Sequence, residues 1–210
     1  MPTDPSTEHK DFTDSACRAA WRSALRRDAI ARRVALSQDD YAQGSRAVCR
    51  HLLANFSQLA VMRVGFYWPI NREPDLRPAL ETWLAAGDTA FAALLPVVTD
   101  TGVALSFRRW RQDAAMAADR YGIPIPAAGE FIQPQALLIP LAAFDANGFR
   151  LGYGGGYFDR TLAQLRPRPL AIGVGFDLCR VDSIHPEAHD ERLDSVVTET
   201  GVISFGGTNK

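Results

Sequence analysis

The glycine-rich segment at residues 152–156 most constrains how this chain can fold. Four of its five positions are glycines, Gly152, Gly154, Gly155 and Gly156. Glycine exposes its backbone N–H and tolerates conformations closed to other residues, so a run of glycines can form a concave nest for an anion. Residues 136–140 are typical of a buried strand, and residues 157–165 of a helix. A strand, a glycine loop and a helix together predict a phosphate-type site at the start of the helix.

Two common phosphate motifs do not fit this segment. A Walker loop requires Gly-Lys-Ser/Thr, whereas Gly156 is followed by Tyr157 and Phe158. The dinucleotide fingerprint G-x-G-x-x-G, counted from Gly152, ends on a tyrosine. A glycine-rich turn without a ligand is the alternative. The flanking arginines, tyrosines and aspartate favour a ligand site of another kind.

Composition limits the functional classes open to the protein. A chain of 210 residues that is 47% hydrophobic is long enough for one domain with a sizeable core. Its net charge of -1 argues against bulk attraction to nucleic acid. Cys17, Cys49 and Cys179 are widely separated, and they form neither a metal pair nor a disulfide framework. With no apolar run that could span a bilayer and no signal-peptide core in residues 1–11, we expect a cytoplasmic protein.

The N-terminal region divides into two parts. Residues 1–13 are polar, and we expect them to be mobile. Residues 14–36 are rich in Ala, Arg and Leu and predict a helix, with an apolar stripe every fourth residue: Trp21, Leu25 and Ala29. A basic stripe lies beside it, formed by Arg18, Arg22, Arg26 and Arg33. The usual interpretation of such arginines is a solvated helix face.

The remaining chain alternates between helix and strand patterns. Ser37 predicts the cap of a second helix that runs to residue 55. Further helices are predicted at 76–86 and 113–120, strands at 61–67, 89–95, 104–110, 170–175, 196–197 and 202–205, and an irregular linker at 121–129. This alternation favours an α/β sheet with helices on both faces. In such proteins the loops at strand ends carry ligands, so Trp68 and Glu73 are candidates, with core packing and a first-turn helix acid as the respective alternatives.

Two pairs of residues could bind metal. His185 and His189 are four apart, but Pro186 and the polar surroundings favour a surface loop over a zinc site. Asp159, just past the glycine loop, and Asp190 carry the hard oxygen ligands that magnesium prefers. Capping or surface charge is the alternative for both aspartates.

Four segments resemble one family in the same order along the chain. Residues 150–159 (RLGYGGGYFD) are similar to the signature of the 5-formyltetrahydrofolate cyclo-ligases, also called methenyltetrahydrofolate synthetases. Weaker matches are residues 22–26 (RSALR), 67–74 (YWPINREP) and 189–194 (HDERLD). The chain departs from the family in having Arg22 where lysine is usual and Phe158 where tyrosine is common. Arginine keeps the charge but not the shape of lysine, and phenylalanine has no hydroxyl to assign a role.

The resemblance implies both a fold and a reaction. The fold is a single three-layer, Rossmann-like α/β domain over residues 14–210, with helices on both faces of a mostly parallel sheet. The reaction converts 5-formyltetrahydrofolate and ATP into 5,10-methenyltetrahydrofolate, ADP and phosphate: the formyl oxygen attacks the γ-phosphate, N10 closes the ring and phosphate leaves. The protein need only align the reactants and neutralise charge. ATP and Mg²⁺ are the implied cofactors, and we expect a monomer with neither a nucleic-acid nor a membrane partner.

The resemblance also assigns site residues. Arg150, Tyr153 and Asp159 are the expected catalytic residues, and Asp159 and Asp190 the magnesium ligands. The ATP site comprises Arg22, Ser23, Ala24, Leu25, Arg26, Arg150, Leu151, Gly152, Tyr153, Gly154, Gly155, Gly156, Tyr157 and Phe158. The folate site comprises Trp68, Glu73, Tyr153, Gly154, Gly155, Gly156 and Tyr157; Trp68 rests on the residues alone.

Three other functions stay open from the sequence. A non-catalytic nucleotide- or folate-binding protein of the same fold would bind without turnover. A sugar-phosphate isomerase or CoA transferase of related α/β fold would use a glutamate as base or nucleophile and would not need ATP. An RNA-binding module could use the arginine-rich helix, but the near-neutral charge argues against it.

Overall fold

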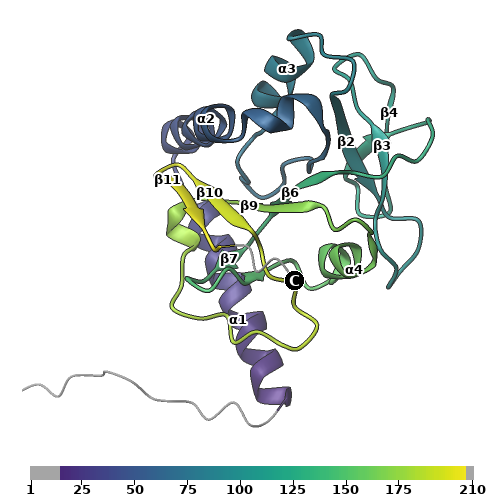
Figure 1. Cartoon of the computed structure of the whole chain (residues 1–210). Helices are drawn as coiled ribbons and strands as arrows, with labels where there is room; N and C mark the ends of the chain where they lie inside the picture. The colour runs from purple at the N-terminus through teal and green to yellow at the C-terminus, as the bar shows by residue number, and fades with distance from the viewer. Residues whose placement is uncertain (1–14, 207–210) are drawn as a thin grey trace, which may run out of the picture.

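A seven-stranded sheet forms the centre of the protein. The computed structural model describes residues 15–206, and its strand order is β11-β10-β9-β6-β1-β2-β3 (Figure 1). The strands are β1 (Arg63–Gly65), β2 (Ala92–Val97), β3 (Ser106–Arg109), β6 (Ala136–Pro140), β9 (Leu170–Val174), β10 (Ser195–Thr198) and β11 (Gly201–Ser204). The five inner strands pair in parallel, and the two outermost pairs are antiparallel. The mostly parallel sheet expected from the sequence is confirmed.

Alternate residues of the central strand β6 face two separate cores. Ala136 and Leu138 belong to a cluster that includes residues of α2 (Gln38–Asn55) and α3 (Arg77–Ala85). Leu137 and Ile139 belong to a second cluster, which includes Leu162 of α4 (Tyr157–Gln164). Period-two alternation sends neighbouring side chains to opposite faces of a strand. Helices therefore cover both faces, as predicted, and β6 is apolar throughout because neither of its faces meets water.

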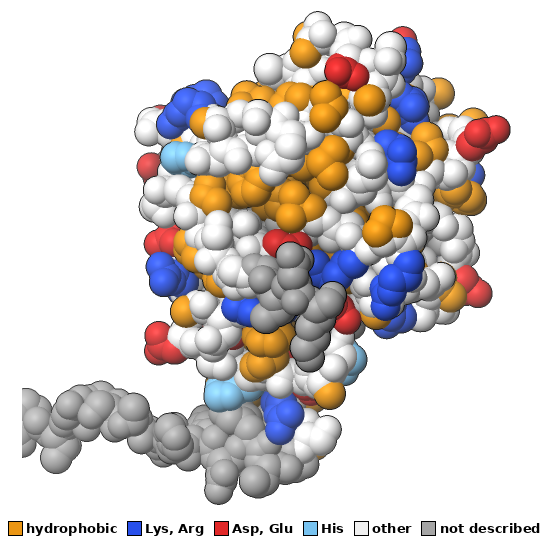
Figure 2. Space-filling model, in the orientation of Figure 1, with side chains coloured by type: hydrophobic (Ala, Val, Ile, Leu, Met, Phe, Trp, Pro, Cys, Tyr) orange, Lys and Arg blue, Asp and Glu red, His pale blue; other side chains and the backbone are white. Residues whose placement is uncertain are grey.

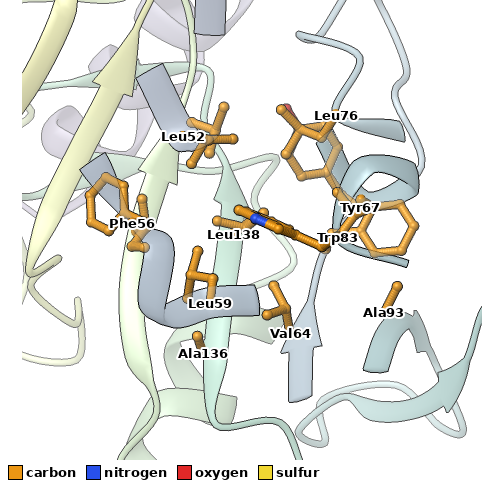
Figure 3. Close-up of a cluster of buried hydrophobic side chains, with 14 of the residues drawn as sticks. Leu52, Phe56, Leu59, Val64, Tyr67, Leu76, Trp83, Ala93, Ala136 and Leu138 are labelled. Carbon is orange, nitrogen blue, oxygen red and sulfur yellow. The ribbon is translucent and has the colours of Figure 1, made fainter. Parts of the chain in front are cut away.

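The first core is built by side chains that converge from helices and strands. Figure 3 shows Leu52 of α2, Phe56 directly after that helix, Leu59 of the 3-10 helix η1 (Ser57–Val61), and Trp83 of α3 directed toward the strands. Each has 7% or less of its surface exposed. The cap of α2 is also as predicted, because the Ser37 side chain accepts a hydrogen bond from the Asp40 N–H at 3.0 Å. The long first helix, α1 (Ser15–Val34), matches its predicted range within two residues at its C-terminal end.

One short hairpin differs from the sequence-based expectation. The helix predicted at 113–120 and the linker at 121–129 are wrong, because β4 (Met116–Ala118) and β5 (Pro124–Pro126) form an antiparallel hairpin. The Asp119 side chain closes its turn by accepting hydrogen bonds from the N–H groups of Tyr121 and Ile123. Gly122 adopts a positive φ of 76° in the same turn. Local hydrogen bonds from one side chain thus favour a hairpin in a segment whose composition alone suggested a helix.

A second small hairpin separates the central strand from the glycine segment. β7 (Ala143–Phe144) pairs with β8 (Arg150–Leu151), and neither strand is predicted by the sequence pattern. The turn between them is held by Asp145, whose Oδ1 accepts from the N–H groups of Asn147 and Phe149. The glycine segment therefore leaves β8 rather than β6. A further 3-10 turn, η2 (Asp177–Cys179), follows β9.

Other expectations concern the ends and the surface of the chain. The expected mobility of residues 1–13 lies outside the described residues. Within residues 15–206, no helix has the length and apolar character needed to cross a membrane. On the face shown in Figure 2, Lys and Arg side chains are interspersed with Asp and Glu rather than gathered into one basic surface.

Candidate functional site

The glycine segment joins β8 to the N-terminus of α4 and keeps its backbone amides available. Gly156 is the residue that caps α4, with a left-handed φ of 62°, and Gly154 has a φ of 94°. Such angles favour glycine. Within residues 15–206, the N–H groups from Gly154 to Phe158 donate to no acceptor. Unpaired amides at a helix N-terminus attract an anion through their partial positive charge.

Two arginines of α1 lie beside this segment. Arg26 Nε donates to the Gly152 carbonyl at 2.6 Å. Its guanidinium lies close to Gly154, since a Cβ on that glycine would sit 3.6 Å from it. Burial, followed by the positive charge of Arg22, lowers the pKa of Arg26. The mutual repulsion of these cations would be relieved by a bound anion, which is the property expected of a phosphate site.

Arg22 and Arg150 each pair with one of the two predicted metal-binding aspartates. Arg22 makes a two-pronged ion pair with Asp190, at 2.6 and 3.0 Å. Arg150, which is 4% exposed, donates to Asp159 Oδ1 at 3.0 Å. Burial opposes ionisation of Asp190, but hydrogen bonds from Arg22 and the Glu187 N–H outweigh it and lower the pKa of that carboxyl. The structure therefore brings residues from α1, β8, α4 and the 185–191 loop together.

The two aspartates differ in their capacity to bind magnesium. Both oxygens of Asp190 already accept hydrogen bonds, from Arg22 and from the Glu187 N–H. Asp159 uses only Oδ1, for Arg150 and the Glu191 N–H. Its Oδ2 has no partner among the described residues. Asp159 can therefore bind magnesium as its one carboxylate ligand, with phosphate and water oxygens at the other coordination positions. Asp190 could bind the ion only by releasing Arg22.

A buried carboxylate lies at the other side of the glycine segment. Glu73 is 1% exposed, and its Oε1 accepts a hydrogen bond from the Tyr153 hydroxyl while its Oε2 accepts from the Ile70 N–H at 2.8 Å. Burial raises the pKa of Glu73 to about 7; the bonds from Tyr153 and Ile70 and the charge of Arg33 oppose that rise. Glu73 can therefore exchange a proton near neutral pH, or hold a ligand N–H in its ionised form.

Arg33 contradicts the solvated-face interpretation of the basic stripe. Its side chain is completely buried, and it donates to the carbonyls of Asn71 and Leu141 and to the Tyr153 hydroxyl. The sequence grouped it with Arg18 because both share a helical stripe. The missing information was that the last turn of α1 lies against the loop after β1 and the end of β6. Helical periodicity shows which residues share a face, but not what covers that face.

The remaining predicted residues lie in three different settings. Ser23 and Ala24 are exposed, and Leu25 packs against Leu151 in a small apolar cluster. Tyr157 is at the start of α4, with its hydroxyl 2.9 Å from that of Tyr121, a contact that the sequence does not predict. Leu25 therefore serves packing, whereas the paired tyrosine hydroxyls lie at the edge of the glycine segment.

Trp68 lies in a pocket of its own. It lines a space of about 300 Å³ with Arg77, Trp110, Met116 and others, and the Arg77 guanidinium lies 4.8 Å from the centre of its ring. No residue of the glycine segment lines this pocket. The structure thus brings Glu73 to the glycine segment but does not place Trp68 with it.

The two histidines show the loop geometry that the sequence favoured over a zinc site. Both lie in the irregular segment after η2, and His185 packs edge-on against Trp21. The His189 side chain is 70% exposed and lies 3.5 Å from a Glu187 oxygen. Among residues 15–206, no group of three or more His, Cys, Asp or Glu side chains is arranged to hold a metal ion. Both histidines therefore lie in a loop rather than on a helix, as the sequence predicted.

Comparison with known proteins identifies the family to which this site belongs. The model of the 5-formyltetrahydrofolate cyclo-ligase family matches residues 18–199. The chain belongs to this family. The 5-formyltetrahydrofolate cyclo-ligase of Haemophilus influenzae is 26% identical over 162 residues, covering 74% of this chain and 85% of that protein. That of Mycolicibacterium smegmatis is 30% identical over 149 residues, covering 66% and 75%.

A solved structure of the cyclo-ligase family has the same fold. The NMR structure of Aquifex aeolicus 5,10-methenyltetrahydrofolate synthetase aligns with a TM-score of 0.76 and 28% identity, covering 90% of this chain and 95% of that chain. The family resemblance inferred from the four sequence segments is therefore confirmed. One departure also has a structural explanation: Phe158 packs against the second core, where an apolar ring suits its surroundings.

Proposed function

We propose that this cyclo-ligase family member converts 5-formyltetrahydrofolate and ATP into 5,10-methenyltetrahydrofolate, ADP and phosphate. One observation carries the proposal: Tyr153 belongs to the glycine segment and donates its hydroxyl hydrogen bond to Glu73. An anion-binding loop and a buried carboxylate suited to a heterocycle are thereby in direct contact. A reaction in which a folate oxygen attacks a nucleotide phosphate needs this adjacency.

Different residues would bind the nucleotide and the folate. The amides from Gly154 to Phe158, together with Arg26, would bind the nucleotide phosphates and the charge that develops during transfer. Glu73 would accept hydrogen bonds from the N–H groups of the pterin ring. The formyl oxygen then attacks the γ-phosphorus, and ADP leaves. N10 next attacks the activated carbon and loses its proton, and the C–O bond breaks to release phosphate.

Charge neutralisation would complete the site. When bound, Mg²⁺ would offset the negative charge of the phosphates, and Asp159 would be its principal protein ligand through Oδ2. Arg150 holds the other oxygen of Asp159 and so fixes the direction of the carboxylate. The Arg22–Asp190 ion pair would lie beside this site. Asp190 would become the second magnesium ligand if it released Arg22.

The proposed reaction is tested by mixing the protein with 5-formyltetrahydrofolate and Mg-ATP. We expect the absorbance of methenyltetrahydrofolate to rise, with one ADP formed per product, and no rise when ATP or Mg²⁺ is omitted. Binding of both ligands without product would instead establish the non-catalytic binding protein of the same fold. Isothermal titration of each ligand, run in parallel, separates these two outcomes.

A further inference from the structure

Arg33 connects three segments that are distant in sequence. From the last turn of α1, its Nε donates to the Asn71 carbonyl and one terminal nitrogen donates to the Leu141 carbonyl, both at 2.9 Å. Its other terminal nitrogen donates to the Tyr153 hydroxyl. Asn71 lies two residues before Glu73, and Leu141 directly follows β6. One side chain thus contacts the loop that carries the candidate folate carboxylate and the tyrosine of the glycine segment.

Complete burial of this cation needs an explanation. Moving a guanidinium out of water is costly unless hydrogen bonds and an opposite charge compensate. Two of its three bonds go to neutral carbonyls, which would suffice for a structural cross-link. The third continues through the Tyr153 hydroxyl to Glu73, the buried carboxylate of the same cluster. The compensating charge for Arg33 is therefore Glu73, reached through one tyrosine.

Few polar groups face Glu73. Arg33 comes from α1, Tyr153 from the glycine segment, and the Ile70 N–H from its own loop. The Tyr67 hydroxyl, which donates to the Pro74 carbonyl, is the other titratable group that interacts with it. Arg33 is the single cation among these groups. Both the orientation and the ionisation of Glu73 thus depend on a residue that has no surface exposed to a ligand.

We propose that Arg33 is a positioning residue of the cyclo-ligase site. It holds the Tyr153 hydroxyl against Glu73 and favours the ionised form of that carboxylate, which fixes the orientation of the folate side of the site relative to the glycine segment on the nucleotide side. This inference rests on the proposed function for its kinetic consequences. The state of Glu73 can be measured without any ligand, so the two proposals can fail separately.

The decisive experiment follows the Glu73 carboxyl by ¹³C NMR over a pH titration of the unliganded full chain. Glu73→Gln assigns the signal. In Arg33→Met we expect the titration midpoint to move to higher pH, because the cation that favoured the ionised form is gone. Arg33→Lys should bring the midpoint back toward wild type. Arg32→Met is the matched control, because Arg32 is exposed and pairs with Asp28 on the outer surface of the same helix.

Kinetics provide the second measurement. We expect Arg33→Met at pH 7 to raise KM for 5-formyltetrahydrofolate by roughly tenfold, because Glu73, no longer oriented and less ionised, loses its charge-assisted contact with the folate. KM for Mg-ATP should change much less. A simple structural cross-link predicts lower thermal stability with an unchanged Glu73 midpoint and an unchanged KM, and that result would overturn the proposal. A wild-type protein without turnover would refute the proposed function while leaving the Glu73 titration as the test of Arg33.

A double-mutant comparison covers the case in which Arg33→Met does not fold. Tyr153→Phe keeps the ring but removes the hydroxyl that joins Arg33 to Glu73. If Arg33 acts through that hydroxyl, Arg33→Lys should raise the folate KM in the wild-type background and add little in the Tyr153→Phe background. Fully additive effects of the two substitutions would overturn the proposal.

Discussion

At the scale of single residues, the arginines of α1 differ in function because they differ in their partners. Arg32 pairs with Asp28 on the surface, where an ion pair contributes little. Arg22 pairs with a largely buried aspartate. Among the described residues Arg26 donates a hydrogen bond only to the Gly152 carbonyl, and Arg33 is part of a buried network. A cation that is not paired with a carboxylate is the one best able to bind phosphate.

Arg26→Ala should therefore affect ATP more than stability. We expect KM for Mg-ATP to rise about tenfold or more, from the loss of a charge-assisted contact, with a small change in Tm. Arg22→Ala should weaken ATP binding and also lower Tm, since Asp190 loses its ion pair. Exposed Arg27→Ala serves as the control. Equal, small effects at all three positions would restore the interpretation of a solvated face.

Asp159 is expected to be the more important metal ligand. In Asp159→Asn the side-chain oxygen can still accept from Arg150 and the Glu191 N–H, so the fold should persist. Turnover should fall at least tenfold, and the Mg²⁺ concentration for half-maximal rate should rise. Asp182→Asn, an exposed acid in the same region, is the control. Unchanged turnover at low Mg²⁺ in Asp159→Asn would remove this residue from the metal site.

Glu73 should make stability depend on pH in a known direction. In the folded protein its raised pKa keeps the proton bound up to about pH 7, whereas the unfolded chain releases it at about pH 4.3. Stability from this group therefore falls as pH rises between those values, by roughly 4 kcal/mol in total. Urea unfolding of wild type and Glu73→Gln at pH 5 and pH 8 measures this difference. We expect the free energy of unfolding of Glu73→Gln, relative to wild type, to be higher at pH 8 than at pH 5. No such increase would mean that Glu73 titrates normally.

At the scale of elements, the glycine segment is a β8-to-α4 connection whose four glycines have different roles. Gly154 and Gly156 have the positive φ angles that favour glycine. A Cβ on Gly155 would lie 2.7 Å from the Tyr157 ring, whereas a Cβ on Gly152 would meet nothing within 4 Å. A residue larger than glycine is therefore disfavoured at Gly154, Gly155 and Gly156, but it can be accommodated at Gly152.

This difference predicts the outcome of two substitutions. Gly155→Val should abolish conversion of 5-formyltetrahydrofolate with little change in secondary structure, because the new side chain displaces Tyr157 and obstructs the amides. Gly152→Ala should retain near-normal turnover. Thermal midpoint and turnover are measured on the same preparations. A destabilised Gly155→Val whose folded fraction works at the wild-type rate would mean that the segment is only a structural turn.

At the scale of the whole molecule, the parallel sheet separates packing from the candidate site. The two cores lie on opposite faces of β6, and Figure 1 shows α2 and α3 on one side of the sheet and α4 on the other. The glycine segment, the 67–75 loop and the end of β6 meet through Arg33, beyond the carboxyl ends of central strands. Substitutions in the core should therefore lower the fraction of folded protein more than they lower the turnover of each folded molecule.

Leu138→Ala tests that separation. Leu138 is completely buried in the core beneath α2 and α3 (Figure 3), so its truncation should cost about 2–5 kcal/mol of unfolding free energy. Because Leu53 is only half-buried, Leu53→Ala should lower the free energy of unfolding by less. Denaturant unfolding gives the stability, and turnover per folded molecule should remain close to wild type at 20 °C to within about twofold. A large loss of turnover in a fully folded sample would show that the core and the site are coupled.

The sequence by itself determined the features that depend on local pattern. The apolar run of β6, the helix of α1, the Ser37 cap and the left-handed positions of the glycine segment follow from periodicity, capping and the properties of glycine. The family resemblance named the candidate site residues. Tertiary structure alone decided that Arg33 is buried, that Tyr153 bonds Glu73 and that Asp159 keeps an oxygen available. Those facts depend on which distant segments meet, because burial and charge pairing are properties of contacts that local sequence does not encode.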